Sequence, residues 1–247
     1  MNRRALIIFS PNSDPENILV GPNSDNDNYR DYLMSRAGGN WRSSEIVSME
    51  DPDSGQVLAA IRKLTREIDF TLTIFTGHGF VDPSNNVQYL VLNDVSIPII
   101  KLANKADRQA IIIDACRGYY RPYSEEIMKA FSDIYESQVG VTGSTRELYD
   151  DAVMRADKGI TVLYAATESE SALDTDNGGA YLLSLLKAAE LWEEKDKSNL
   201  VLDLKRAHQI AVNYLQETFI TGQTPSMNVE KRKIHFPFSV KFAPLNG

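Results

Sequence analysis

The sequence has little cysteine, no long apolar run and a deficit of basic residues. A single cysteine among 247 residues excludes an internal disulfide and a zinc site built from several thiolates, and it favours a reducing compartment. No stretch of about 18 consecutive apolar residues occurs, so no membrane-spanning helix is predicted. There are 26 Lys and Arg against 34 Asp and Glu, which gives a formal charge of -8. This charge repels phosphate backbones and anionic lipids and argues against a nucleic-acid or membrane partner.

No secretion signal is predicted either. The first residues, MNRRALIIFSPNSD, hold two arginines and a short apolar run. Pro11 and Asp14 end that run before the core of a signal peptide can form. Together with the single cysteine, this predicts a cytoplasmic protein.

Short apolar, β-branched segments alternate with helical patterns along the chain. The predicted strands are apolar runs bounded by turn residues, and they cover residues 5–9, 45–49, 70–75, 110–113 and 160–165. The predicted helices cover 26–37, a segment that begins near Ser54, 180–194 and 200–219. With 43% hydrophobic residues, this order predicts one α/β domain, residues 1–247, with a mostly parallel sheet.

Residues 119–158 interrupt this alternation. Tyrosines, charges and glycines mix there, and only 124–137 has a helical pattern. A connection of this length inside a domain is usually functional or mobile, so we expect a mobile connecting segment. The last predicted strand, 233–242, contains Pro237, which places it near a sheet edge and favours a monomer.

Two predicted strands end in residues suited to nucleophilic catalysis. His78 follows the segment FTLTIFTG, and Cys116 follows AIIIDA. Ligands bind beyond the carboxyl ends of the strands in open α/β sheets, so the two side chains are expected to face one another there. An imidazole helps a thiol to become the thiolate nucleophile and later protonates the leaving amine. The pattern therefore predicts a Cys–His catalytic dyad.

Glycines at positions 77, 79 and 118 flank these two residues. Without a Cβ, the backbone there can approach a substrate closely. The N–H groups of Gly79 and Cys116 are then candidates for an oxyanion hole. Removing one such donor from an acyl-transfer site typically slows the reaction about 100-fold or more.

The pair of motifs carries a family resemblance. A strand that ends in TGHG, followed by a strand that ends in DACRG, resembles the caspase-like cysteine peptidases, which include caspases, metacaspases, paracaspases and bacterial orthocaspases. The caspase signature Gln-Ala-Cys-(Arg, Gln or Gly)-Gly is matched by residues 114–118 except at its first position. The resemblance implies a sheet of about six strands with helices on both faces. It divides the chain into a large-subunit-like part, 1–118, the connecting segment, and a small-subunit-like part, 159–247.

The residue two positions before the cysteine sets the expected specificity. Caspases that cut after aspartate have glutamine there, whereas this chain has Asp114, an arrangement that resembles metacaspases and orthocaspases. The same resemblance places a second acid at Asp25, with Asp27 as the alternative, and a pocket-lining residue at Thr76. Carboxylates on a pocket floor attract a guanidinium or an ammonium group. This predicts an endopeptidase that cleaves after arginine and, second, lysine. Structural alternatives are an Asp114 that satisfies loop amides and an Asp25 that belongs to a helix N-terminus.

The remaining acids give no metal site. Calcium-dependent metacaspases have an acid-rich stretch after the histidine, but this chain offers only Asp82 and Asp94, too few for six to eight oxygen ligands. We therefore predict no calcium requirement, no metal and no organic cofactor. Asp174 and Asp176, in the segment ALDTDNGG, either line the substrate cleft or cap the helix that follows.

Basic residues in the connecting segment are candidate sites of self-processing. They are Arg146, Arg155 and Lys158, and cleavage there matches the predicted specificity. The resemblance implies protein or peptide substrates, a self-processing regulatory role in cell death or defence, and a regulatory partner protein.

Other function classes stay open. A lone cysteine at a strand end is most often a small buried hydrophobe, so a catalytically silent scaffold or binding module is the main alternative. The presence of both His78 and Cys116 argues against it. An unrelated α/β enzyme has little support because GxGxxG, GxxxxGK(S/T) and GxSxG motifs are missing. His208 and His235 lack catalytic surroundings and are expected to be structural.

Overall fold

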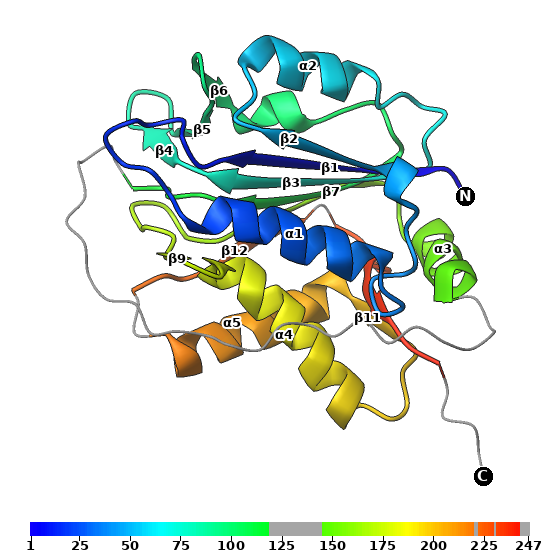
Figure 1. Cartoon of the computed structure of the whole chain (residues 1–247). Coiled ribbons are helices and arrows are strands. Elements are labelled where there is room, and N and C mark those ends of the chain that lie inside the picture. Colours follow the sequence, from blue (N-terminus) through cyan, green and yellow to red (C-terminus); the bar gives the residue numbers. More distant parts are fainter. Residues whose placement is uncertain (119–144, 220–221, 230, 243–247) are drawn as a thin grey trace.

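A computed structural model describes residues 1–118, 145–219, 222–229 and 231–242. Its centre is a six-stranded sheet in the order β12-β8-β7-β3-β1-β2 (Figure 1). Every neighbouring pair is parallel except β12 with β8. The strands are β1 (Arg3–Ser10), β2 (Ile46–Glu50), β3 (Phe70–Gly77), β7 (Arg108–Asp114), β8 (Gly159–Tyr164) and β12 (Ser226–Val229). The predicted mostly parallel sheet is confirmed.

Helices cover both faces of this sheet, as predicted. One face carries α1, α4 and α5, and the other carries α2 (Figure 1). Alternation along β1 explains the two apolar layers, since Ala5 and Ile7 join the larger core while Leu6 and Ile8 join the smaller one. The helices are α1 (Gly21–Met34), α2 (Ser54–Arg62), α3 (Thr145–Arg155), α4 (Ala180–Lys195) and α5 (Leu204–Thr218).

Small strand groups accompany the main sheet. A three-stranded antiparallel sheet and two strand pairs were not predicted, because their strands are short and mix polar with apolar residues. The antiparallel sheet begins directly after His78 and so lies beside the end of β3. These strands are β4 (Gly79–Asp82), β5 (Val87–Val91), β6 (Ser96–Pro98), β9 (Asp174–Thr175), β10 (Gly178–Gly179), β11 (Val201–Asp203) and β13 (Pro237–Val240).

The predicted last strand forms, and it is an edge strand, but of a small two-stranded sheet. β13 forms within residues 233–242, but it pairs with β11 and not with the main sheet. The two edges of the main sheet are β2 and β12, and β12 is a short segment whose pattern gave no strand signal. Pro237 therefore protects neither of these edges, and the argument from Pro237 for a monomer no longer applies.

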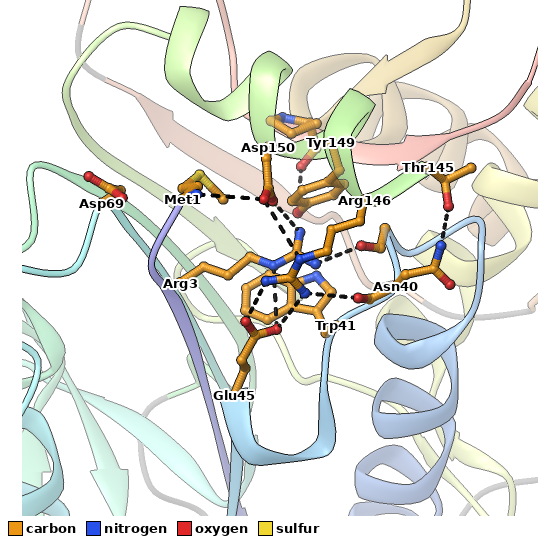
Figure 2. A network of polar contacts seen from close by, with 12 residues as sticks. Met1, Arg3, Asn40, Trp41, Glu45, Asp69, Thr145, Arg146, Tyr149 and Asp150 are labelled. Carbon is orange, nitrogen blue, oxygen red and sulfur yellow. Dashed lines mark hydrogen bonds and ion pairs between the residues drawn. The ribbon is translucent and has the colours of Figure 1, made fainter. Parts of the chain in front are cut away.

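Helix α3 forms in a part of the chain for which no helix was predicted. Its position depends on an ionic network at the amino ends of the strands (Figure 2). The fully buried guanidinium of Arg3 pairs with Asp150 at 2.9 Å and lies over the Trp41 ring at 4.4 Å. Arg146 binds both carboxylate oxygens of Glu45, at 2.9 and 2.5 Å. Residues 145–158 are thus part of the folded domain, whereas the predicted helix 124–137 lies outside the described residues.

Among the described helices, none is long and apolar enough to cross a membrane.

Candidate active site

The register of β3 and β7 brings the two predicted catalytic residues to one edge of the sheet. Thr76 on β3 lies opposite Asp114 on β7. His78 and Cys116 each follow that pair by two residues. Because the strands are parallel, both side chains leave the sheet at its carboxyl edge, where open α/β sheets bind ligands.

The imidazole of His78 is oriented by a backbone carbonyl. Its Nε2 lies 2.5 Å from the carbonyl oxygen of Asn17, in the loop before α1. A carbonyl oxygen only accepts hydrogen bonds, so Nε2 carries the proton of the neutral ring. Nδ1 is then the unprotonated nitrogen that is able to take a proton from a thiol. Asn17 was not predicted as a site residue, because a backbone carbonyl is present at every position and leaves no signature in the sequence.

The Cys116 thiol is half-buried against the segment that follows β8. Its Sγ lies 3.4 Å from the Ala172 N–H donor and 3.7 Å from the Ala172 carbonyl oxygen. Burial, the largest effect, raises the pKa of this thiol above its ordinary value, and the nearby charge of Asp114 adds to the increase. The thiol is therefore the neutral form at neutral pH before a substrate binds.

Gly79 packs directly against the cysteine loop. A Cβ at this position would lie 3.1 Å from the Cys116 carbonyl oxygen and 2.9 Å from the Ala115 Cβ. The Val91 N–H donates to the His78 carbonyl, so Gly79 and Leu90 are a non-hydrogen-bonded pair of the β4–β5 ladder. The Gly79 N–H consequently points away from β5. Its direction leaves it available to a ligand beside Cys116, the position that an oxyanion donor requires.

Asp25, Thr76 and Asp114, the three residues predicted to line the pocket, lie together beside this edge. The Thr76 hydroxyl donates to Asp25 at 2.6 Å, and all three side chains are buried. Asp25 accepts the Gly179 N–H at 2.9 Å, while Asp114 accepts the Leu182 N–H at 3.1 Å. Both carboxylates thus lie at the N-terminus of α4, whose partial positive charge favours anions. Asp27 is exposed, so Asp25 is the acid that belongs to this group.

The backbone of the β10 strand leaves room for these carboxylates. A Cβ at Gly178 would overlap the Asp25 carboxylate, and a Cβ at Gly179 would overlap that of Asp114. Burial raises the pKa of Asp114 to about 7. Burial and the neighbouring Asp114 charge raise the pKa of Asp25 well above its ordinary value. Two acids that resist ionisation in the free protein would ionise readily beside a bound cation.

Asp174 caps a helix, but a different one from the helix expected. Its Oδ2 accepts the N–H groups of Val20 and Gly21 at 3.0 and 3.2 Å, at the start of α1. The predicted alternative was a cap on α4, which follows it in sequence. Asp176 is exposed, and its backbone carbonyl accepts the Ser24 hydroxyl.

Other predicted residues form no described hydrogen bond with His78 or Cys116. His208 accepts or donates a hydrogen bond with Tyr181 at 2.7 Å, and burial lowers its pKa to about 4. Asp82 accepts from Ser84, and Asp94 accepts from Ser54, in separate turns. The described residues contain no cluster of three or more His, Cys, Asp or Glu side chains arranged for a metal ion.

The three candidate processing sites differ in accessibility. Arg146 is inside α3 and bound to Glu45, so cleavage after it requires the helix to unwind and the ion pair to break. Arg155 and Lys158 are exposed at the end of α3 and in the turn before β8. Lys158 pairs with Asp107 at 2.5 Å on the surface.

Comparison with known proteins identifies the family. The profile of the caspase domain matches residues 2–233, nearly the whole chain. The chain belongs to the caspase-domain family. Caspase-1 from Spodoptera frugiperda is a solved structure with the same fold, with a TM-score of 0.60 and 14% sequence identity over 92% of this chain and 86% of that one. A search of curated protein sequences gives no match.

Caspase-domain membership makes the chain a cysteine peptidase, a hydrolase that acts on protein substrates, as predicted. It also confirms the predicted caspase-like α/β fold. At 14% identity, the structural similarity concerns the fold alone. What this member cleaves depends on its own residues around Cys116 and Asp114.

Proposed function

We propose that this caspase-domain protein is an endopeptidase that cleaves after a basic residue, arginine before lysine, by a Cys116–His78 dyad. Asp25 and Asp114, buried together beside Cys116, are the observation that carries this proposal. In the alternative, a catalytically silent scaffold, the two acids would serve only as acceptors for the α4 N–H groups and the Thr76 hydroxyl. The lack of a basic side chain among their described contacts favours a pocket that takes a cation from the substrate.

The dyad uses the tautomer that Asn17 fixes. His78 Nδ1 takes the proton of the Cys116 thiol, and the sulfur attacks the carbonyl carbon of the scissile bond. The N–H groups of Gly79 and Cys116 stabilise the tetrahedral oxyanion. The imidazolium then returns its proton to the leaving amine, and a thioester forms. Water, deprotonated by His78, hydrolyses the thioester and frees the thiol.

The acidic pair explains a preference for arginine. A guanidinium offers a planar fork of N–H donors that can engage two carboxylates at once, whereas the lysine ammonium is a compact point charge. An aspartate side chain in the same place brings no cation and cannot favour ionisation of the two acids, so it is disfavoured. Thr76 helps by donating to Asp25 and so fixing one acid in position.

The Ala172 main chain is suited to hold the substrate backbone beside the thiol. Its N–H and carbonyl both face Cys116, whereas the groups of Leu173 face inward, to the Gln223 side chain and the Ala180 N–H. A peptide that pairs with Ala172 in the manner of an added strand displaces the thiol from this contact. Substrate binding thus releases the thiol toward His78.

The proposal includes self-cleavage after Arg155 or Lys158, which are both exposed. Arg146 is the least suitable of the three candidate sites because it is bound to Glu45. A regulatory role in cell death or defence, a partner protein that controls it and a cytoplasmic location belong to the same proposal. They rest on the family resemblance and on the single cysteine.

The test is a set of fluorogenic peptides that differ only at the residue before the cut: arginine, lysine, aspartate or leucine. We expect hydrolysis of the arginine peptide, slower hydrolysis of the lysine peptide, and none with Cys116→Ala. The same peptides are run with calcium and with a chelator, and equal rates are expected. A native protein that hydrolyses none of the four and does not react with an arginyl chloromethyl ketone supports the silent scaffold.

A further inference from the structure

The start of α1 is capped by a residue from the other end of the chain. Val20, at the cap position, has no polar side chain, and the helix has no cap bond of its own. Asp174 supplies it, since its Oδ2 accepts the N–H groups of Val20 and Gly21 at 3.0 and 3.2 Å. Such caps normally come from the residue just before the helix. Here the cap ties the β9–β10 hairpin of the small-subunit-like part to the large-subunit-like part.

The capped residues directly follow the carbonyl that orients His78. Only Ile18 and Leu19 separate Asn17 from Val20. The loop is closed on itself, because the Asn17 N–H donates to the Asp14 carbonyl and the Leu19 N–H to the Pro11 carbonyl, each at 3.0 Å. With so little chain between them, a shift at Val20 moves the Asn17 carbonyl as well.

The hairpin and α1 fit without spare space. A Cβ at Gly21 would overlap the Asp174 carboxylate and lie 2.8 Å from the Thr175 carbonyl. On the next turns, Ser24 donates to the Asp176 carbonyl and Asn28 to the Asn177 carbonyl, both at 2.9 Å. The start of α1 therefore has one position relative to the hairpin, and the Asp174 carboxylate binds the two residues that follow the loop that orients His78.

We propose that Asp174 is a positioning residue for the catalytic histidine: by holding Val20 and Gly21, it keeps the Asn17 carbonyl on His78 Nε2 and so leaves Nδ1 free for the thiol. The inference rests on the proposed Cys116–His78 dyad.

A cap that served only stability would behave differently. Loss of such a cap lowers the thermal stability of the protein and leaves the chemistry of a distant side chain unchanged. If Asp174 positions His78, loss of the cap instead changes the tautomer populations of His78 and lowers kcat. A misplacement of about 1 Å at a reacting group can cost about 100-fold in rate.

The experiment compares Asp174→Ala, Asp174→Asn and the matched control Asp176→Ala. Asparagine keeps an oxygen that accepts both N–H groups but loses the charge. The tautomer of His78 is read from ¹⁵N NMR of the imidazole nitrogens, which is simple to assign in a chain with 3 histidines. Turnover is measured as kcat and KM on the arginine peptide, and thermal unfolding is followed for each variant.

We expect Asp174→Ala to lower kcat about 100-fold and to mix the two His78 tautomers, while Asp174→Asn keeps the Nε2–H tautomer and restores most of kcat. Asp176→Ala should match the native protein. Should Asp174→Ala not fold, Val20→Pro, which removes one donor and leaves the carboxylate, is measured in the same way and should give a smaller loss in the same direction.

An Asp174→Ala protein with the native tautomer and native kcat overturns the inference, and so does an Asp174→Asn protein as impaired as Asp174→Ala. The NMR measurement needs no substrate. If the native protein cleaves no peptide, the proposed function fails while the tautomer still decides the role of Asp174.

Discussion

Thr76 on β3 and Asp114 on β7 lie opposite one another in the sheet register, and both are buried. This pair connects the proposed specificity pocket with the proposed dyad. His78 lies two residues after Thr76, and Cys116 lies two residues after Asp114. The strand register that builds the acidic pocket thus also sets the separation of the dyad.

Removal of either dyad member should abolish turnover without unfolding the protein. His78→Gln is expected to lower kcat by about 100- to 10,000-fold, the range for loss of general acid–base catalysis. His235→Gln is the matched control, since the charges near His235 are those of Asp203, Lys205, Arg232 and Asp157 and none belongs to the pocket. Peptide hydrolysis and thermal unfolding are measured together. Equal activity of His78→Gln and native protein would remove His78 from the mechanism.

Asp114→Asn should stabilise the protein at alkaline pH. Burial raises the pKa of Asp114 from 3.8 to about 7, so between pH 4 and 7 the folded state holds a proton that the unfolded state has lost. The free energy of unfolding therefore falls as pH rises through this window. Asparagine has no proton to lose and keeps an acceptor for the Leu182 N–H.

At pH 8 we expect Asp114→Asn to gain up to about 4 kcal/mol, the equivalent of about three pKa units, and to lose arginine cleavage. At pH 4 the two proteins should have similar stability. Chemical denaturation at both pH values measures this. A variant less stable than the native protein at pH 8 would contradict the direction of the shift.

Gly179→Ala tests the shape of the pocket. Its backbone angles suit alanine, with φ -66° and ψ 133°, but the new methyl group would overlap the Asp114 carboxylate. The displaced acid should lower kcat/KM for the arginine peptide about 10- to 100-fold. The control is Gly222→Ala, where a Cβ meets nothing within 4 Å. If both variants cleave equally well, Asp114 does not hold the substrate.

The thiol should react slowly before substrate binds. Burial raises the pKa of Cys116, so little thiolate is present at pH 7. At pH 7, iodoacetamide is expected to alkylate Cys116 more slowly than it alkylates glutathione. The rate of alkylation of Cys116 should still increase with pH above pH 9. Because the chain has one cysteine, the label count reports on Cys116 alone. A rate that levels off below pH 7 would mean that a thiolate is present at rest.

The ionic network around Arg3 should support stability and leave catalysis unchanged, because it lies at the amino ends of the strands. Glu45→Gln removes one of the two carboxylates that pair with the buried Arg3 and the half-buried Arg146, the other being Asp150, and this should cost about 3 kcal/mol. Hydrogen bonds and charge from Arg146 hold the pKa of Glu45 at about 2 despite its burial. This contribution is present above the ordinary pKa of 4.5 and is lost as pH falls toward 2. Unfolding at pH 7 and pH 3 measures it, with kcat/KM at pH 7 expected to be native.

Much of the main sheet was predictable because β1, β3, β7 and β8 are nearly continuous apolar runs. The short, polar β12 had no such signal. It is a strand because it pairs with β8, and its own residues carry no apolar pattern that indicates one. The acids Asp25 and Asp114 were found through the family resemblance. Their meeting at α4 depends on contacts across 154 and 68 residues, which a sequence pattern does not express.

The Asn17 carbonyl and the Ala172 main chain were not predictable for a different reason. Every residue has the same backbone groups, so their role follows from position alone. Asp174 was noted as a cap, but the helix that it caps lies 153 residues earlier in the chain. The role of Asp174 as the cap of α1 is visible only in the folded structure, where the β9–β10 hairpin packs against α1.

The most direct test of the central claim compares two peptides that differ only in arginine or citrulline before the cut. Citrulline has nearly the same shape as arginine but no charge. If Asp25 and Asp114 recognise the guanidinium charge, kcat/KM should fall by about 1000-fold or more with citrulline, because two buried acids then lack a cation. Equal rates for the two peptides would contradict the account.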